Sequence, residues 1–427
     1  MLLSPGGARI DADARHKAVN LYSSRMPMAD FNPPERRDEA GLESPILVEA
    51  MAARSGTSDC SSGSPLQGSP RPQSAPRRPG DRPDQAGGPH PVSRQSTPTR
   101  QAYAAIDLGT NNCRLLIAKA SDDNFTVIDA FSRVVRLGEG LAQTGRLSDE
   151  AMDRALGALH ICADKLKRRN VHLARSVATE ACRRASNGED FIERVRRETG
   201  IHLNVISAQE EARLAVLGCH ILLETGDGPA MIFDIGGGST ELVLIESTPS
   251  VPRILDWQSV PWGVVSLSET CGPEPLSDDD RRTRYARMRE LVRDSFADFA
   301  KRIDPARSKG PIGELRLLGT SGTVTTLASL HLDLPQYDRR AVDGLIVQVD
   351  AMRDISSRLA MMSAAERRAV PCIGRERADL VVAGCAILET IMDLWPADRL
   401  GVADRGIREG ILRSMMAASG APAGTRP

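Results

Sequence analysis

Hydrophobic and polar residues follow a regular pattern from Tyr103 onward, and residues 1–100 lack that pattern. In the regular part, short apolar runs of strand length alternate with longer stretches whose apolar residues recur at helical spacing. Strands that alternate with helices are typical of α/β domains. The pattern therefore predicts a folded α/β region that begins near residue 101 and ends near residue 420.

The first half of this region, residues 101–225, is predicted to form one domain. Apolar runs in YAAIDLG, CRLLIAKA and FTVIDAFSRVVRLG predict three strands, and VHLARSVAT and IHLNVIS predict two more. A helix is expected after Ser148, a good N-cap residue, because acids occupy its first turn and KLKRR its last. NGEDFIERVRRETG predicts a helix closed by Gly200, and QEEARLAVLGCHILLE predicts the next helix.

The order of elements begins again at Ala230, which predicts a second domain over residues 226–420. MIFDIGGG predicts a strand and a turn, STELVLIE a returning strand, and ELRLLGTSGTVTTLASL a strand, a glycine turn and a helix. A long helix is expected from about Ser277 to Arg302. ADLVVAGCAILETIMDLW and DRGIREGILRSMM have helical spacing; Gly384 predicts a close contact between helices, and the last helix is expected to pack back on the first domain.

Residues 1–100 and 421–427 are predicted to be disordered. The first of these segments is rich in Ser, Pro, Gly and Arg and has few large apolar residues, so it cannot bury enough surface to offset its ordering entropy. Its apolar run Pro45–Ala52 predicts no more than a transient helix. The segment is either a regulatory or localising tail, or a weakly constrained extension or mis-assigned start.

The composition of the 427 residues is that of a soluble globular protein. Hydrophobic residues make up 41% and charged residues 26%, while aromatic residues are only 3%, which predicts a core of Ala, Val, Leu and Ile. The formal net charge of −1 provides no overall basic field for a nucleic-acid or membrane partner. We therefore expect neither kind of partner.

Cysteine spacing and hydropathy favour a cytoplasmic protein. The eight cysteines form no CxxC pair and show no zinc-ligand spacing, so reduced and mostly buried thiols are expected. No run of about 18 apolar residues predicts a transmembrane helix. The N-terminus also lacks the basic and apolar regions of a secretory signal.

Candidate chemistry comes from an internal repeat. When AAIDLGTNNCRLLIA is aligned with MIFDIGGGSTELVLI, Asp107 falls on Asp234 and Arg114 on Glu241. Each copy is an apolar strand that ends in Asp, a glycine-containing turn and a second apolar strand. Glycine allows the backbone N–H groups of such a turn to approach one phosphate. The aspartates suit a hydrated Mg²⁺ that neutralises the phosphate. A single turn of this kind is equally well explained as a tight hairpin with a capping aspartate, but the duplication favours a phosphate site between two domains.

These residues resemble the phosphate loops of the superfamily of actin, heat-shock chaperones and hexokinase. A closer resemblance is to its exopolyphosphatase/guanosine pentaphosphate phosphohydrolase family. It runs in order through IDLGTNNCRLLIA, VATEACRRASNGEDFIERV, VISAQEEARLAVLG, FDIGGGSTELVLI, LLGTSGTVTTLASL and DRGIREGIL, and so covers residues 103–417. ISAQEEAR followed closely by DIGGGSTEL is the most specific part. The resemblance implies two actin-like (ribonuclease H-like) domains with an interdomain cleft.

The resemblance also implies roles for individual residues. The catalytic glutamate of the family is the second acid of its EEAR motif, here Glu211, which would orient or deprotonate the attacking water. Arg183 matches the arginine near the scissile phosphate. Taken alone, Glu211, which lies beside Glu210 and two residues before Arg213, would be read as part of a solvated surface pair. Arg183 would be explained equally well as a surface salt-bridge residue.

The resemblance further implies a set of Mg²⁺ ligands and a set of phosphate-binding residues. Asp107 and Asp234 are expected at the metal, with Glu241 as an additional ligand or as an acid that positions water. The residues expected to wrap the phosphates are Gly109, Thr110, Asn111, Gly236, Gly237, Gly238 and Ser239. GTSGT, residues 319–323, is expected to be structural or to contact the distal substrate.

The implied reaction is Mg²⁺-dependent release of terminal orthophosphate from inorganic polyphosphate, from guanosine pentaphosphate or from both. The chain ends shortly after DRGIREGILRSMM, so it resembles the short two-domain type, for which processivity on long polyphosphate stays open. A homodimer is common in the family. Two alternatives remain, a non-catalytic sensor that binds guanosine tetraphosphate or polyphosphate, and a kinase that transfers phosphate to a small acceptor.

Overall fold

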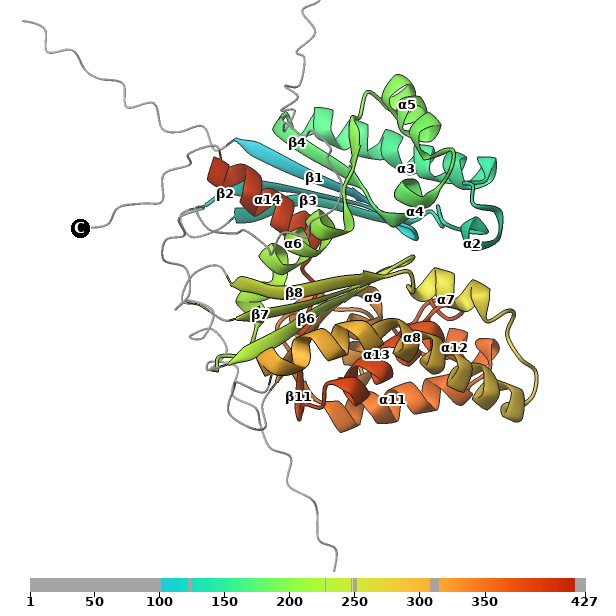
Figure 1. Cartoon of the computed structure of the whole chain (residues 1–427). Coiled ribbons are helices and arrows are strands. Elements are labelled where there is room, and N and C mark those ends of the chain that lie inside the picture. Colours follow the sequence, from blue (N-terminus) through green and yellow to red (C-terminus); the bar gives the residue numbers. More distant parts are fainter. Residues whose placement is uncertain are drawn as a thin grey trace, which may run out of the picture. The chain divides into compact units, whose positions relative to one another are not determined.

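A computed structural model describes residues 101–418 apart from 122–124, 227, 247, 249–251 and 308–314 (Figure 1). The predictions for residues 1–100, including the transient helix at Pro45–Ala52, and for residues 421–427 lie outside the described residues. Within them, the structure contains two β-sheets with helices packed on their faces, which confirms the predicted α/β class.

The first sheet is built from residues 102–205 in the strand order β3-β2-β1-β4-β5. β1 to β3 form an antiparallel meander, and β4 and β5 continue from β1 in parallel. The strands are β1 (Ala102–Leu108), β2 (Asn112–Ala120), β3 (Phe125–Val134), β4 (Val171–Ala178) and β5 (Leu203–Val205). β1 is almost entirely buried because both faces of the sheet are covered: Ala104 and Ile106 face one core, and Tyr103 and Ala105 face another.

The helices of the first half are α2 (Leu141–Thr144), α3 (Asp149–Arg168), α4 (Glu180–Arg184), α5 (Gly188–Thr199) and α6 (Ala208–Cys219). The predicted start of α3 is confirmed, since the Ser148 side chain accepts a hydrogen bond from the Ala151 N–H. The end of α5 is also confirmed, because Gly200 takes the left-handed conformation with φ of 73°. α6 is shorter than predicted: the chain passes into the 3₁₀ turn η1 (His220–Leu222), and Leu222 packs against the second sheet.

The second sheet is built from residues 229–403 in the order β10-β11-β9-β6-β7-β8. Its strands are β6 (Pro229–Ile235), β7 (Thr240–Glu246), β8 (Arg253–Val260), β9 (Arg316–Thr320), β10 (Ile346–Gln348) and β11 (Arg399–Ala403). Strands β8-β7-β6-β9-β11 repeat the order and directions of β3-β2-β1-β4-β5. The sequence repeat therefore corresponds to a repeated sheet topology.

The helices of the second half are α7 (Val264–Thr270), α8 (Asp278–Arg307), α9 (Gly322–His331), α10 (Arg339–Val342), α11 (Val349–Met361), α12 (Ala364–Ala369), α13 (Val381–Leu394) and α14 (Ile407–Ala418). The few aromatic residues gather here, where Phe296 and Phe299 of α8 lie 5.7 and 5.8 Å from Trp395, centroid to centroid. The predicted close contact at Gly384 is confirmed, because a methyl group there would lie 2.2 Å from the Thr323 hydroxyl oxygen.

Helices α6 and α14 cross in close contact, and both carry residues of the core beside the first sheet (Figure 1). A methyl group at Gly410 would lie 2.0 Å from the Leu214 carbonyl oxygen, so the helix backbones meet directly at this point. α6 also contributes Ala212 and Val216 to the core beside the second sheet. This helix therefore touches both sheets, which brings its first turn to the space between them.

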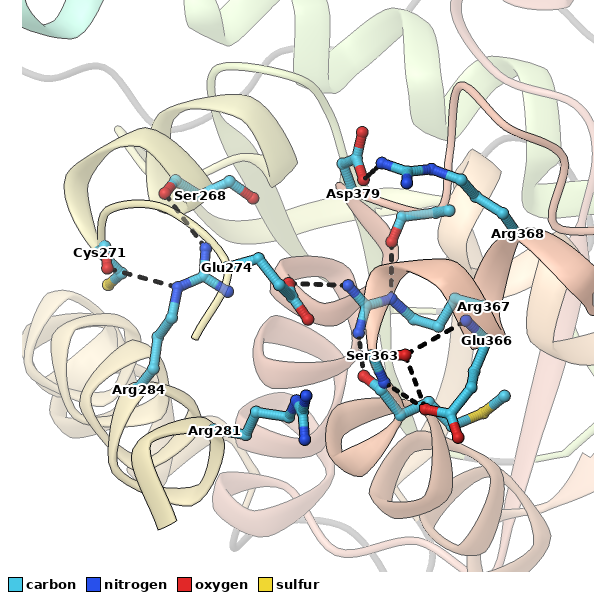
Figure 2. A network of polar contacts seen from close by, with 12 residues as sticks. Ser268, Cys271, Glu274, Arg281, Arg284, Ser363, Glu366, Arg367, Arg368 and Asp379 are labelled. Atoms are coloured by element: carbon cyan, nitrogen blue, oxygen red, sulfur yellow. Dashed lines mark hydrogen bonds and ion pairs between the residues drawn. The ribbon is translucent and has the colours of Figure 1, made fainter. Parts of the chain in front are cut away.

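Arg367 of α12 is fully buried and joins three segments of the second half (Figure 2). Its Nε donates to the Ala378 carbonyl at 2.7 Å, its Nη1 donates to the Met362 carbonyl, and its Nη2 donates to Glu274 Oε2 at 2.8 Å. Glu274 lies in the loop after α7. The first residues of α7, Val264 and Val265, donate backbone hydrogen bonds to the glycine turn after β6. The guanidinium thus fixes that loop to α12 and to the chain before α13.

Arg367→Met is expected to lower the free energy of unfolding by about 3–5 kcal/mol, because it leaves Glu274 without its buried partner. The neighbouring Arg368, whose pair with Asp379 is about half exposed, provides the matched control. Arg368→Met is expected to cost no more than about 1 kcal/mol. Denaturant unfolding of both variants measures the difference, and equal losses would contradict the assigned role of Arg367.

The cysteines agree with the expectation of reduced, mostly buried thiols. All seven cysteines in the described part of the chain are free thiols, and most of them are buried. None of the described helices has the length and apolar character needed to cross a membrane.

Candidate active site

A pocket of about 950 Å³, open solvent at its mouth included, is lined by residues from both sheets. Asp107 and the turn after β1 contribute from the first sheet, and Asp234 and the turn after β6 contribute from the second. Every site residue predicted from the sequence lines this pocket except Arg183. The structure therefore brings together segments that lie more than a hundred residues apart in the chain.

The two turns have the same hydrogen-bonded geometry. The Gly109 N–H donates to the Asn112 carbonyl, and the Gly236 N–H donates to the Ser239 carbonyl, each at 2.9 Å. The strands that flank the turns pair in the same register: Asp107 lies opposite Arg114, and Asp234 lies opposite Glu241. Each motif is a hairpin whose aspartate lies two residues before the first glycine of the turn, and both hairpins line the same pocket.

Glycine is needed where the turns approach each other. A methyl group at Gly238 would lie 1.9 Å from Glu180 Oε2 and 2.7 Å from Thr110 Oγ1. A methyl group at Gly237 would lie 2.9 Å from Thr110 Cβ. The turn of the second sheet therefore packs directly on residues of the first.

Glu211 lies in the first turn of α6 and has only 7% of its surface exposed. Arg183 Nη1 donates to Glu211 Oε2 at 3.1 Å and to the Ile206 carbonyl at 2.8 Å. The reading of Glu211 as a solvated surface acid is therefore wrong. α6 directs this carboxylate into the pocket.

Glu210, the neighbour of Glu211, lies outside the pocket lining and forms salt bridges with Arg175 and Arg213. Burial pushes the pKa of Glu210 upward, but the hydrogen bonds from the two arginines outweigh it and lower the pKa overall. Two adjacent acids thus have opposite surroundings. Glu210 is accordingly the natural control for substitutions of Glu211.

Four carboxyls of the pocket hold their protons more tightly than ordinary acids. Burial, reinforced by the negative charge of Glu241, raises the pKa of Glu211 well above its usual range. Burial, again with Glu241, raises the pKa of Asp234 to about 8. Burial also raises the pKa of Asp107, and that of Glu241 despite hydrogen bonds from Ser239 and Ser259. Crowded, buried carboxylates of this kind favour binding a cation.

The residues present fit a Mg²⁺ ion that is completed by its ligand. Asp107 Oδ1 is buried and has no hydrogen-bond partner among the described residues. Over that same part of the chain, no three His, Cys, Asp or Glu side chains converge on a metal position. Mg²⁺ commonly binds one or two protein carboxylates together with water and substrate phosphates. Asp107 and Asp234 supply such a pair, whereas Glu241 Oε1 already accepts hydrogen bonds from Ser239 at 2.7 Å and Ser259 at 2.8 Å.

Two arginines that were not among the predicted site residues also line the pocket, Arg114 of β2 and Arg377 before α13. Burial and the positive charge of Arg114 lower the pKa of Arg377, so the two guanidinium groups face the same space. Arg377 Nη1 donates to the hydroxyl of Thr326 at 3.0 Å. An anion between these arginines would relieve their repulsion. The repeat alignment marked the position of Arg114, but no sequence signal marked Arg377.

The GTSGT segment also reaches the pocket. Ser321 caps α9 by accepting a hydrogen bond from the Val324 N–H, and Gly322 and Thr323 line the pocket. A helix N-terminus favours negative charge. Of the two sequence readings, a structural segment or one that contacts the distal substrate, this placement favours the second.

The basic runs KLKRR (residues 165–169) and ERVRR (residues 193–197) lie outside the pocket lining. Lys165 and Arg169 of KLKRR both bind Asp129, and Arg196 of ERVRR binds Glu193. Arg183, expected at the scissile phosphate, instead holds Glu211, so its direct contact with phosphate stays a prediction.

A model of the Ppx/GppA phosphatase family matches residues 116–419. The chain is 31% identical over 326 residues to exopolyphosphatase 2 of Mycobacterium tuberculosis, which covers 73% of this chain and 98% of the relative. It is 27% identical over 317 residues to a putative exopolyphosphatase of Haemophilus influenzae, which covers 73% of this chain and 90% of that one.

Solved structures show the same fold. The crystal structure of an exopolyphosphatase from Cytophaga hutchinsonii superposes with a TM-score of 0.64 at 27% identity, covering 76% of this chain and 100% of that one. A member of the same family from Aquifex aeolicus superposes with a TM-score of 0.60 at 29% identity, covering 75% of this chain and 99% of that one. These matches confirm the predicted actin-like fold.

Proposed function

Because the chain belongs to the Ppx/GppA phosphatase family, we propose that it hydrolyses phosphoanhydride bonds in the pocket between the two turns. The substrate would be the end of inorganic polyphosphate, the terminal phosphate of guanosine pentaphosphate, or both. The observation that carries this proposal is the convergence of Glu211, Asp107 and Asp234 on one pocket with both glycine turns.

Glu211 is the candidate general base. Its raised pKa makes its carboxylate a stronger base than that of an ordinary glutamate, and Arg183 fixes its orientation. As Glu211 accepts the proton, the water oxygen forms a bond to the terminal phosphorus. The bridging P–O bond breaks, and the shortened polyphosphate leaves with the electron pair.

Asp107 and Asp234 would hold Mg²⁺, which supplies positive charge against the phosphate oxygens when bound. The backbone N–H groups of the glycine turns would receive the terminal phosphate. Arg114, Arg377 and the N-terminus of α9 would bind the phosphates behind it.

Parallel assays with purified protein test the reaction and its substrate. Orthophosphate release is measured from polyphosphate and from guanosine pentaphosphate, at equal Mg²⁺, without any added acceptor. The proposal expects release from at least one of them, and the ratio of the two kcat/KM values assigns the preference. Phosphate transfer to an added acceptor, with no orthophosphate release in its absence, would identify a kinase. Binding without release would identify a sensor.

A further inference from the structure

Glu180 is a buried acid of the pocket with no part in the reaction described above. It begins α4 directly after β4, has 5% of its surface exposed, and lines the pocket beside the two turns. Burying a carboxylate costs free energy unless hydrogen-bond partners replace the water that it loses. Its two oxygens have different partners, and those partners define what it does.

Each oxygen of Glu180 accepts one hydrogen bond. Thr110 Oγ1 lies 3.2 Å from Oε2, and Arg184 Nη1 donates to Oε1 at 2.9 Å. In the contact between them, the Thr110 hydroxyl is the donor and the Glu180 carboxylate oxygen is the acceptor. Glu180 therefore accepts the one hydrogen bond that the Thr110 side chain can donate.

The rotamer of Thr110 leaves its hydroxyl little freedom to turn away. A methyl group at Gly138 would lie 2.3 Å from Thr110 Cγ2, so the threonine methyl fills the space beside this glycine. The Gly138 N–H also donates to the Thr110 carbonyl at 2.9 Å. On the other side, Gly238 leaves no room for a side chain against Glu180 and Thr110.

A hydroxyl carries one proton and two acceptor lone pairs. Because the Thr110 hydroxyl donates its proton in the hydrogen bond to Glu180, its oxygen can offer only lone pairs to the pocket. Ionised phosphate oxygens only accept hydrogen bonds, so they cannot bind to these lone pairs. A water molecule can donate a hydrogen bond to them. If Thr110 binds phosphate, as the sequence predicts, its backbone N–H is therefore the group that donates to the phosphate. Its hydroxyl oxygen is left to accept a hydrogen bond from a donor such as water.

We propose that Glu180 is a positioning residue that orients the Thr110 hydroxyl to accept a hydrogen bond from the attacking water. This inference rests on the proposed hydrolysis. It gives the pocket two groups that act on water, Glu211 as the base and Thr110 as a second acceptor. It assigns Glu180 an effect on turnover and no contribution to substrate affinity.

Glu180→Gln reverses the polarity of the contact. Arg184 donates only, so it retains the single oxygen of the new amide, and the amide nitrogen then faces Thr110. Thr110 accepts from that nitrogen, and its own proton turns toward the pocket, where it suits phosphate and not water. The expected result is a fall in kcat of about tenfold, the size of one hydrogen bond, with KM for polyphosphate unchanged or lower.

Thr110→Val separates positioning from packing, because it keeps the shape of the side chain and removes the hydroxyl. Its kcat is expected to fall about as far, and Glu180→Gln is expected to add less than about twofold in the Thr110→Val background. Thr110→Ser retains the hydroxyl and is expected to retain kcat within about threefold. Glu189→Gln, at an exposed position in the first turn of α5, is the matched control.

Thermal melting and circular dichroism establish that each variant is folded. Three results would each overturn the inference while leaving the hydrolase proposal intact. The first is an unchanged kcat in Glu180→Gln, and the second is a rise in KM without loss of kcat. The third is an equal loss of kcat from Glu180→Gln in the wild-type and Thr110→Val backgrounds. A wild-type protein that releases no orthophosphate from polyphosphate or guanosine pentaphosphate would overturn both.

Discussion

Glu211→Gln is expected to lower the rate of orthophosphate release by about a hundredfold to ten-thousandfold, the range contributed by a positioned general base. The substitution keeps the size of the side chain and a contact for Arg183, but it removes the group that takes the proton from water. Substrate affinity is expected to stay within a few fold of wild type. Steady-state phosphate release and equilibrium binding of polyphosphate measure the two effects separately.

The pH profile supplies a second readout for Glu211. Its pKa is raised by burial and by Glu241, and a base must be deprotonated to act. The wild-type rate is therefore expected to rise with pH along a limb that lies above the usual range of glutamate, and the residual rate of Glu211→Gln is expected to lack this limb. Glu210→Gln, which changes the adjacent acid outside the pocket lining, should keep both the rate and the limb. Similar losses from the two substitutions would contradict the role of Glu211.

Asp234→Asn is expected to lower Mg²⁺-dependent release by about a hundredfold or more, because it removes one of two carboxylates proposed to hold the metal. It is also expected to remove the rise in melting temperature that Mg²⁺ gives the wild type. Asp153→Asn on the exposed side of α3 is the control and should change neither property.

Without metal, the same substitution is expected to stabilise the protein at alkaline pH. The pKa of Asp234 is about 8 in the folded protein, and that of an unfolded aspartate is about 3.9, so the folded state binds this proton more tightly. The associated stability is fully present below about pH 4 and is lost as the pH rises through about 8. Asparagine cannot ionise, so melting temperatures in chelator should fall less between these pH values in Asp234→Asn. An equal fall in both proteins would contradict the burial of an ionisable Asp234.

Local patterns predicted much of the fold because they depend on neighbouring residues. The Ser148 cap, the left-handed Gly200 and the strand–turn–strand repeats at Asp107 and Asp234 all appear as expected. The alignment of the repeats even paired the correct positions, since the same residues face each other across the hairpins. The C-terminal end of α6 and the short helix α4 were not predicted, because tertiary packing determines both.

The rest of the site depends on contacts between distant segments. Arg377 comes from a part of the chain without any local motif, and only the folded structure places it near Arg114. Glu180 lies beside Arg183 in the sequence, but its hydrogen bond to Thr110 spans 70 residues. Arg183 was assigned by resemblance, and the structure shows it in contact with the candidate base. Such pairings have no sequence periodicity that reveals them.

In the proposed reaction, water attacks a terminal phosphate held between the two turns. Turnover of polyphosphate in water enriched in ¹⁸O, with Mg²⁺ and no acceptor, tests it most directly, with the released orthophosphate analysed by mass spectrometry. Each orthophosphate released is expected to carry one ¹⁸O atom, and the release rate is expected to fall strongly in Glu211→Gln and to stay unchanged in Glu210→Gln. Orthophosphate without the label, or labelled release that is unaffected by Glu211→Gln, would contradict it.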